Sequence, residues 1–166
     1  MIKLFLLKKS GYSFQSVIRI VHSLDSNGIV IYDKKGKAVI KQADLYLGIS
    51  HSGDWAVIGV GKENFGIDIQ RYKRKSSEFI EYITGDNEMP LPMVFKIWSI
   101  KESFVKWLGT GWIGIEPDDI YIDFNLQKVY SKTKAAYFIT SEIFDSYVVC
   151  VCSELSSILK ERIIFE

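Results

Sequence analysis

Apolar residues follow two patterns along this chain: short runs, which predict strands, and helical repeats, which predict helices. Strands are predicted at residues 2–7, 28–32, 46–50, 55–60, 65–69, 120–124, 128–130, 136–139 and 147–152. Helices are predicted at residues 14–24, 77–83 and 93–108. Ser13 is placed to cap the first helix, and Gly109 is placed to end the longest one.

The order of these elements is similar in the two parts of the chain. A strand, a helix and further strands precede residue 65, and a strand, helices and strands follow it. The sequence contains no low-complexity linker and no repeated motif that would prove a duplication. We therefore predict a single domain over residues 1–166, built from two related halves of about 1–65 and 66–166.

Length and charge narrow the classes of function. A chain of 166 residues with 48% hydrophobic residues can bury one core without a disulfide or metal staple. A net charge of +1 gives no reason to expect a nucleic-acid partner. Two segments are locally basic, Lys34, Lys35, Lys37 and Lys41 in one and Arg71, Lys73, Arg74 and Lys75 in the other. They either flank a common site or lie in solvated loops.

The cysteines and the apolar segments bear on the cellular compartment. Cys150 and Cys152 are one residue apart on a predicted strand, so they share a face in a geometry that disfavours a disulfide. We expect both to be small buried hydrophobic residues. The apolar run at the start is too short for a signal peptide, and no run approaches the ~18 residues of a membrane span. We predict a cytoplasmic protein without a membrane partner.

Two carboxylates stand out because their neighbours in the predicted strand or on the predicted helix face are apolar. Asp68 lies between Ile67 and Ile69 in a run that is expected to be buried, so it needs a cation or strong donors as partners. Glu102 lies at the edge of the apolar face of the longest helix, one turn before Lys106, which alone would be an ordinary surface pair. Together the carboxylates predict a hard, oxygen-rich site suited to Mg²⁺, with lysines meeting the charge of bound phosphates.

Three further polar residues need an explanation. Lys101 falls within the apolar helix face, so it either extends to water or contacts a buried negative group. Ser50 and His51 end a predicted strand, where a hydroxyl, an imidazole and backbone amides can converge on an oxyanion. A hydrogen-bonded structural histidine is the alternative. A serine hydrolase is excluded, because adjacent residues cannot form a nucleophile–base pair and no G-x-S-x-G elbow occurs.

The blocks S-H-S-G-D-W at 50–55, G-I-D-I-Q at 66–70 and W-S-I-K-E-S-F-V-K at 98–106 resemble the signature of the 4′-phosphopantetheinyl transferase superfamily, surfactin-synthetase-activating type. The resemblance runs from about Gly36 to Cys152. It implies an α+β fold, a pseudo-two-fold pair of halves with mainly antiparallel sheets and an active site between them. It also implies Mg²⁺-dependent transfer of phosphopantetheine from coenzyme A to a serine of an acyl or peptidyl carrier protein, with release of adenosine 3′,5′-bisphosphate.

The resemblance also implies roles for individual residues. Asp68 and Glu102 would bind the metal, and Glu102 would take the serine proton directly or through a water. His51 and Lys106 would contact the phosphates of coenzyme A, and Lys101 would support the same charge cluster. We also expect Ser50 and Lys37 to bind coenzyme A, and Asp68, Glu102 and Lys106 to form the catalytic group. Our own inference adds an acidic helix of the carrier protein as the partner of the basic segment 71–75.

The chain also departs from the family pattern. Gln70 stands where this type usually has a glutamate that serves as a third metal ligand, so we expect weaker Mg²⁺ binding or binding through a water. The first half is short and Ala38 replaces a usual proline, so coenzyme A affinity is low unless Lys8, Lys9 and the cluster at 34–41 compensate. A catalytically weak homologue that binds coenzyme A or a carrier protein is therefore the alternative function. We expect a monomer, with a dimer as the alternative if apolar surface is left uncovered.

Overall fold

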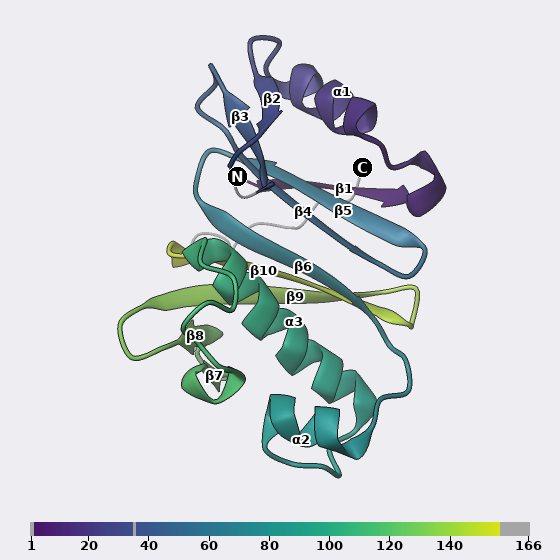
Figure 1. The fold of residues 1–166 in the computed structure, drawn as a ribbon, viewed down its shortest axis with the longest axis vertical. Coiled ribbons are helices and arrows are strands. Elements are labelled where there is room, and N and C mark those ends of the chain that lie inside the picture. Colours follow the sequence, from purple (N-terminus) through teal and green to yellow (C-terminus); the bar gives the residue numbers. More distant parts are fainter. Residues whose placement is uncertain (1, 35, 157–166) are drawn as a thin grey trace.

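The computed structural model describes residues 2–34 and 36–156, which form two antiparallel sheets, a hairpin and covering helices (Figure 1). The first part of the chain contains β1 (Ile2–Lys8), α1 (Phe14–Leu24), β2 (Ile29–Tyr32), β3 (Ala38–Lys41), β4 (Tyr46–Ser52) and β5 (Trp55–Gly61). The second part contains β6 (Phe65–Arg71), α2 (Ser77–Thr84), α3 (Leu91–Leu108), β7 (Tyr121–Asp123), β8 (Lys128–Tyr130), β9 (Ala135–Ile143) and β10 (Tyr147–Ser153). Two short 3₁₀ helices, η1 (Lys9–Gly11) and η2 (Pro117–Asp119), complete the order.

All recorded strand pairs are antiparallel, which confirms the predicted α+β class with antiparallel sheets. One sheet has the order β1-β5-β4 and the other β6-β10-β9-β8-β7, while β2 and β3 form a separate hairpin. In each half the first strand pairs with the last strand, which pairs with the strand before it. This shared order agrees with two related halves, and the duplication itself stays a prediction.

Helix α1 forms where the hydrophobic pattern predicts it. The hydroxyl of Ser13 accepts from the backbone N–H of Ser16, and the Ser16 hydroxyl accepts from the Ser13 N–H, so donors at the start of the helix are satisfied. The apolar face of α1 packs through Val17 and Val21 into a core shared with Ile58 of β5. The predicted cap and bounds of this helix are confirmed.

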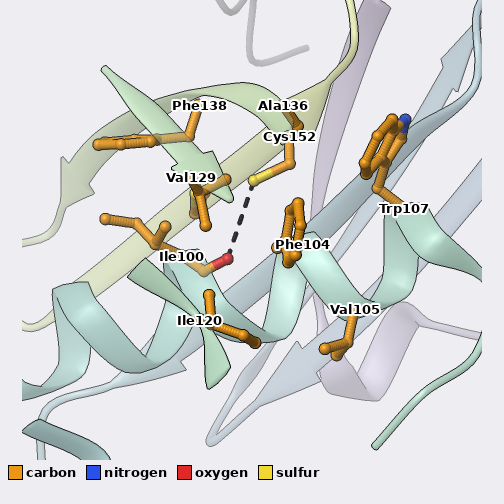
Figure 2. Packing of buried hydrophobic residues seen from close by; sticks show 10 residues of the cluster. Ile100, Phe104, Val105, Trp107, Ile120, Val129, Ala136, Phe138 and Cys152 are labelled. Atoms are coloured by element: carbon orange, nitrogen blue, oxygen red, sulfur yellow. Dashed lines mark hydrogen bonds between the residues drawn. The ribbon is translucent and has the colours of Figure 1, made fainter. Parts of the chain in front are cut away.

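Helix α3 crosses the five-stranded sheet and carries the second core (Figures 1 and 2). Ile100 and Phe104 pack among residues of β8, β9 and β10, and the Cys152 thiol lies 3.8 Å from the Ile100 carbonyl oxygen (Figure 2). Cys150 and Cys152 are free and buried, and both lie within 3.1 Å of the Ser103 hydroxyl. The prediction that they are buried small residues is confirmed.

The two sheets meet where β4 lies beside β6. The Ser50 hydroxyl accepts from the Ile69 N–H at 3.3 Å, and the Ser52 hydroxyl accepts from the Arg71 N–H at 3.0 Å. Side-chain oxygens of one strand therefore satisfy amides of the other, which fixes the register of the two halves. Gly48 permits this contact, because a side chain there would lie 2.7 Å from Ile67.

Three element predictions need correction. Strand β3 was not predicted, because its four residues follow a lysine-rich turn and pair only with the short strand β2. Strand β9 extends to Ile143 because its polar residues continue the ladder with β10. Helix α3 begins at Leu91, and Pro92 lies in its first turn, where a proline is tolerated because that N–H has no helical partner.

No helix in the described part of the chain is long and apolar enough to cross a membrane.

Replacing Gly66 by alanine tests the contact between β6 and α3. A Cβ at this position would overlap the Ser103 carbonyl oxygen and lie 2.5 Å from the Trp107 nitrogen, both of which are helix backbone. We expect Gly66→Ala to lower the free energy of unfolding by at least ~2 kcal/mol in urea denaturation, since backbone cannot move aside as a side chain can. Gly11→Ala, where nothing lies within 4 Å, is the control and should change it by less than ~0.5 kcal/mol. Equal stabilities of the two variants would contradict the close approach.

Candidate active site

The centre of the candidate site is the carboxylate of Asp68, which is 1% exposed on β6. One carboxylate oxygen accepts from the Lys106 ammonium at 2.7 Å and from the Ser50 hydroxyl at 2.9 Å. The other accepts from the Gln70 amide at 2.9 Å. The expectation that a buried strand aspartate has a strong partner is confirmed, and Lys106 supplies the positive charge.

Lys106 joins this buried group to a cavity. Its ammonium also donates to the Ser50 hydroxyl at 3.0 Å, and its side chain is 35% exposed. The cavity has a volume of about 360 Å³ and is lined from both halves, by residues of the β2–β3 hairpin, β4, β6 and the end of α3. Three of the predicted phosphate-binding residues, Lys37, His51 and Lys106, share its wall. The arrangement gives a cavity that favours anions.

The side chains of Ser50 and His51 point to different surroundings although the two residues are adjacent in the sequence. Successive side chains of a strand point to opposite faces. His51 is exposed and lines the cavity, whereas Ser50 is 6% exposed and bonds to Asp68 and Lys106. The structure therefore places Ser50 in the network behind Lys106 and does not place it on the cavity wall, where a coenzyme A contact would require it.

Glu102 lies on α3 one turn before Lys106. The Trp112 indole N–H donates to one of its carboxylate oxygens at 2.9 Å. Burial raises the pKa of Glu102 above its ordinary value and the negative charge of Asp68 raises it further, while the Trp112 hydrogen bond and Lys106 lower it. Asp68 and Glu102 therefore interact electrostatically, and the metal that they were expected to share stays a prediction.

The raised pKa of Glu102 has a defined effect on stability. The folded protein binds a proton at Glu102 more readily than the unfolded chain does. Ionised Glu102 therefore destabilises the fold above its folded-state pKa, and this penalty fades as the pH falls toward the ordinary value of 4.5. A cation bound beside Glu102 would oppose the same penalty.

The donor set fits Mg²⁺ in its chemistry. Asp68 and Glu102 offer carboxylate oxygens, and the Gln70 amide would offer a neutral oxygen if it turned over. Residues 2–34 and 36–156 contain no group of three or more His, Cys, Asp or Glu side chains that could hold a metal. Magnesium commonly completes its shell with water and substrate phosphates, so two carboxylates are enough. One Asp68 oxygen accepts from two protein donors and the other accepts from Gln70 alone, so the second oxygen keeps an acceptor site that a metal could use.

The structure does not bring Lys101 to this site, which corrects the expectation that it supports coenzyme A phosphates. Its ammonium is buried and donates to the carbonyl oxygens of Ile83 at 2.8 Å and Pro117 at 2.9 Å. Burial lowers its pKa, and the charge of Asp118 raises it. Lys101 neither extends to water nor meets a buried anion. It ties α2 and η2 to α3.

The described residues of the two basic segments make different contacts. Lys37 of the first segment lines the cavity, and its backbone N–H donates to the Asp33 carboxylate. Lys35 lies outside the described residues. In the second segment Arg71 lies 3.7 Å from Asp54 in an exposed ion pair, and Lys75 lies over the Phe79 ring.

Three aromatic residues of the site were not predicted from the sequence. Tyr12 and Tyr32 line the cavity, and no local pattern marks them because they come from a loop and a hairpin that only the fold brings together. Trp112 was also missed, although a tryptophan just after a Gly-x-Gly turn beside the Glu102 helix is a signal for it.

Comparison with known proteins shows the family to which the chain belongs. Residues 64–152, more than half of the chain, match the model of the 4′-phosphopantetheinyl transferase superfamily. The chain therefore belongs to that superfamily.

Individual relatives agree with this assignment. The chain is 26% identical over 156 residues to the 4′-phosphopantetheinyl transferase gsp of Aneurinibacillus migulanus, a match that covers 86% of this chain and 65% of that protein. It is 26% identical over 156 residues to the 4′-phosphopantetheinyl transferase Sfp of Bacillus subtilis (strain 168), covering 84% and 69%. The 4′-phosphopantetheinyl transferase psf-1 of Bacillus pumilus is 29% identical over 107 residues, 57% of this chain and 46% of that protein. The chain spans about two thirds of the length of the first two relatives.

Replacing Lys106 by methionine tests the ion pair with Asp68. The variant keeps most of the side-chain volume but leaves a buried carboxylate without its cation, so we expect the free energy of unfolding to fall by ~2 kcal/mol. Lys132→Met is the matched control, because Lys132 and Asp119 form an exposed pair at 3.6 Å, and it should change the free energy by less than ~0.5 kcal/mol. Urea denaturation without metal measures both. Losses of equal size would show that Asp68 does not depend on Lys106.

Proposed function

We propose that this chain transfers the 4′-phosphopantetheine group from coenzyme A to a serine of an acyl or peptidyl carrier protein, with Mg²⁺ as cofactor. One observation carries the proposal. A single cavity between the halves has Lys37, His51 and Lys106 on its wall, and the carboxylates of Asp68 and Glu102 are both coupled to Lys106. Membership of the superfamily supports the same reaction.

The basic residues suit a diphosphate donor. Phosphoryl transfer requires an aligned nucleophile and neutralisation of charge on the phosphoryl oxygens. Lys37, His51 and Lys106 would contact the phosphates of coenzyme A from two sides of the cavity. Its volume of about 360 Å³ falls within the usual range of small-molecule sites.

Asp68 and Glu102, with Gln70 directly or through a water, would hold Mg²⁺. When bound, the ion supplies charge neutralisation at the diphosphate. The single ammonium of Lys106 does not balance the two carboxylates, so the pair favours a further cation.

Glu102 is the candidate proton acceptor. Its raised pKa makes Glu102 a better base than an exposed glutamate. The carrier serine oxygen would form a bond to the phosphorus that bears the pantetheine arm, and its proton would pass to Glu102 directly or through a water. The bond from that phosphorus to the bridging oxygen would break, and adenosine 3′,5′-bisphosphate would leave.

The carrier protein would approach the basic segment 71–75, which begins at the last residue of β6. Arg71 is half exposed, and Lys73 and Arg74 are exposed two and three residues further on. An acidic helix of a carrier protein complements this charge, which aids association and orientation more than affinity. We further infer that the protein acts in the cytoplasm as a monomer, in fatty acid, polyketide or nonribosomal peptide synthesis.

A transfer assay tests the proposal. The protein is mixed with coenzyme A, Mg²⁺ and a panel of apo carrier proteins, and the carriers are weighed by mass spectrometry. We expect one or more carriers to gain the phosphopantetheine mass on serine. Glu102→Gln should lower the rate by ~10² or more, whereas Glu81→Gln, at an exposed position of α2, should leave it unchanged. Coenzyme A binding without any mass gain would favour the alternative, a catalytically weak homologue that acts as a binding module.

Replacing Gln70 by glutamate tests the metal site. The Gln70 amide now donates to Asp68, so a carboxylate there would repel Asp68 in the metal-free protein and attract Mg²⁺. We expect Gln70→Glu to lower the Mg²⁺ concentration for half-maximal transfer about tenfold, and to be less stable without Mg²⁺ than with it. The exposed Gln15→Glu on α1 is the charge-matched control. An unchanged or poorer Mg²⁺ requirement would count against Gln70 as a neutral metal ligand.

A further inference from the structure

Trp112 folds back over one face of α3. Trp98 and Glu102 are four residues apart on this helix, so their side chains are neighbours on its surface. The Trp112 ring stacks on Trp98 with ring centroids 5.3 Å apart and planes 2° apart, and its indole N–H donates to the Glu102 carboxylate at 2.9 Å. One side chain therefore covers both residues.

The chain reaches this position through a turn that depends on glycine. Gly109 ends α3 at φ = 74°, and Gly111 has φ = 59°, a left-handed conformation that other residues rarely adopt. Both glycines also line the cavity. The turn that delivers Trp112 to Glu102 thus forms part of the cavity wall beside Lys106.

Residues around the stacked Trp98 and Trp112 rings also hold the indole in place. Trp98 meets Phe79 of α2 edge to face, with centroids 5.9 Å apart, and the Lys75 ammonium lies 4.1 Å from the centre of the Phe79 ring. Ile115, three residues after Trp112, packs against the core of α3 together with it. Because its platform is fixed in this way, the indole N–H has a defined direction before any ligand binds.

We propose that Trp112 is a positioning residue that fixes the direction of the Glu102 carboxylate for metal binding and proton transfer. The inference rests on the proposed function, because it assumes those roles for Glu102. A glutamate side chain has several rotatable bonds, and one hydrogen bond from a rigid ring removes much of that freedom while leaving the other oxygen available. Hydrogen bonds of this kind orient metal-binding carboxylates in other proteins.

Trp112→Phe tests the inference, because phenylalanine retains the ring for stacking and removes the N–H. The probe is Mn²⁺ alone, titrated into the full chain and followed by the electron paramagnetic resonance signal of the free ion. We expect Mn²⁺ to bind about tenfold more weakly to Trp112→Phe. In the transfer assay kcat should fall about tenfold, while KM for coenzyme A changes less than about twofold.

Trp107→Phe is the matched control. Trp107 lies on the same helix and packs on Phe104 in the core, and its ring belongs to that cluster. This variant should lose stability but keep the Mn²⁺ affinity of the unchanged protein. A purely structural role for Trp112 predicts instead that the two variants behave alike.

A spectroscopic readout follows from the same contact. Binding of Mg²⁺ at Glu102 would change the electrostatic surroundings of the Trp112 indole. The tryptophan emission of the unchanged protein should therefore change when Mg²⁺ is added, and that of Trp112→Phe should not. If Trp112→Phe does not fold, as judged by circular dichroism, Trp98→Phe takes its place. Trp98→Phe weakens the ring stacking on Trp112 but keeps the Trp112 N–H. It should therefore also weaken Mn²⁺ binding, but by a smaller factor than Trp112→Phe.

The outcomes separate the inference from the proposed function. Weaker Mn²⁺ binding in the variant supports the inference even if no carrier is modified, a result that would overturn only the transferase proposal. Transfer by the unchanged protein, with equal Mn²⁺ affinity in both proteins, would overturn the inference alone. Absence of Mn²⁺ binding to the unchanged protein, or emission that does not respond to Mg²⁺, would also overturn it.

Discussion

The buried ion pair between Asp68 and Lys106 is the interaction on which the site depends. A carboxylate that is 1% exposed is costly in a protein interior unless positive charge and hydrogen-bond donors surround it. The donors come from β4, β6 and α3, three elements that are distant in the sequence. The pair itself joins β6 to the long helix, and the complete network, which includes Ser50, forms only when both halves have assembled.

The backbone geometry that allows this assembly is set by small residues. Gly66 lets β6 approach the backbone of α3, and Asp68 follows two residues later on the same face of the strand. Ser50 then connects the halves, since its hydroxyl accepts from the Ile69 N–H and from Lys106 and donates to Asp68. A residue expected to contact the ligand thus acts instead as a bridge, and the contact between the sheets and the candidate site share one hydroxyl group.

Local rules were enough to predict what depends on local sequence. The Ser13 cap, the Gly109 stop and the buried strand around Asp68 follow from side-chain chemistry within a few residues. Partners supplied by distant backbone could not be predicted in this way. Lys101 and Lys106 are five residues apart on one helix, and both looked suited to phosphates. Lys101 instead meets the carbonyl oxygens of Ile83 and Pro117, whose positions depend on how α2 and η2 pack.

The charges within the site suggest why Lys106 lies where it does. Asp68 and Glu102 bring two negative charges to a poorly solvated region, and Lys106 returns one positive charge, so the metal-free group retains an excess of negative charge. This excess favours a divalent cation, whereas the cavity in front, with Lys37 and His51 on its wall, favours an anion. Lys106 is the residue shared by both regions, because it bonds to Asp68 and its side chain lines the cavity. If the proposed metal were bound at the carboxylates, it would balance part of the charge of Asp68, and the Lys106 ammonium could then meet a phosphate of the proposed donor.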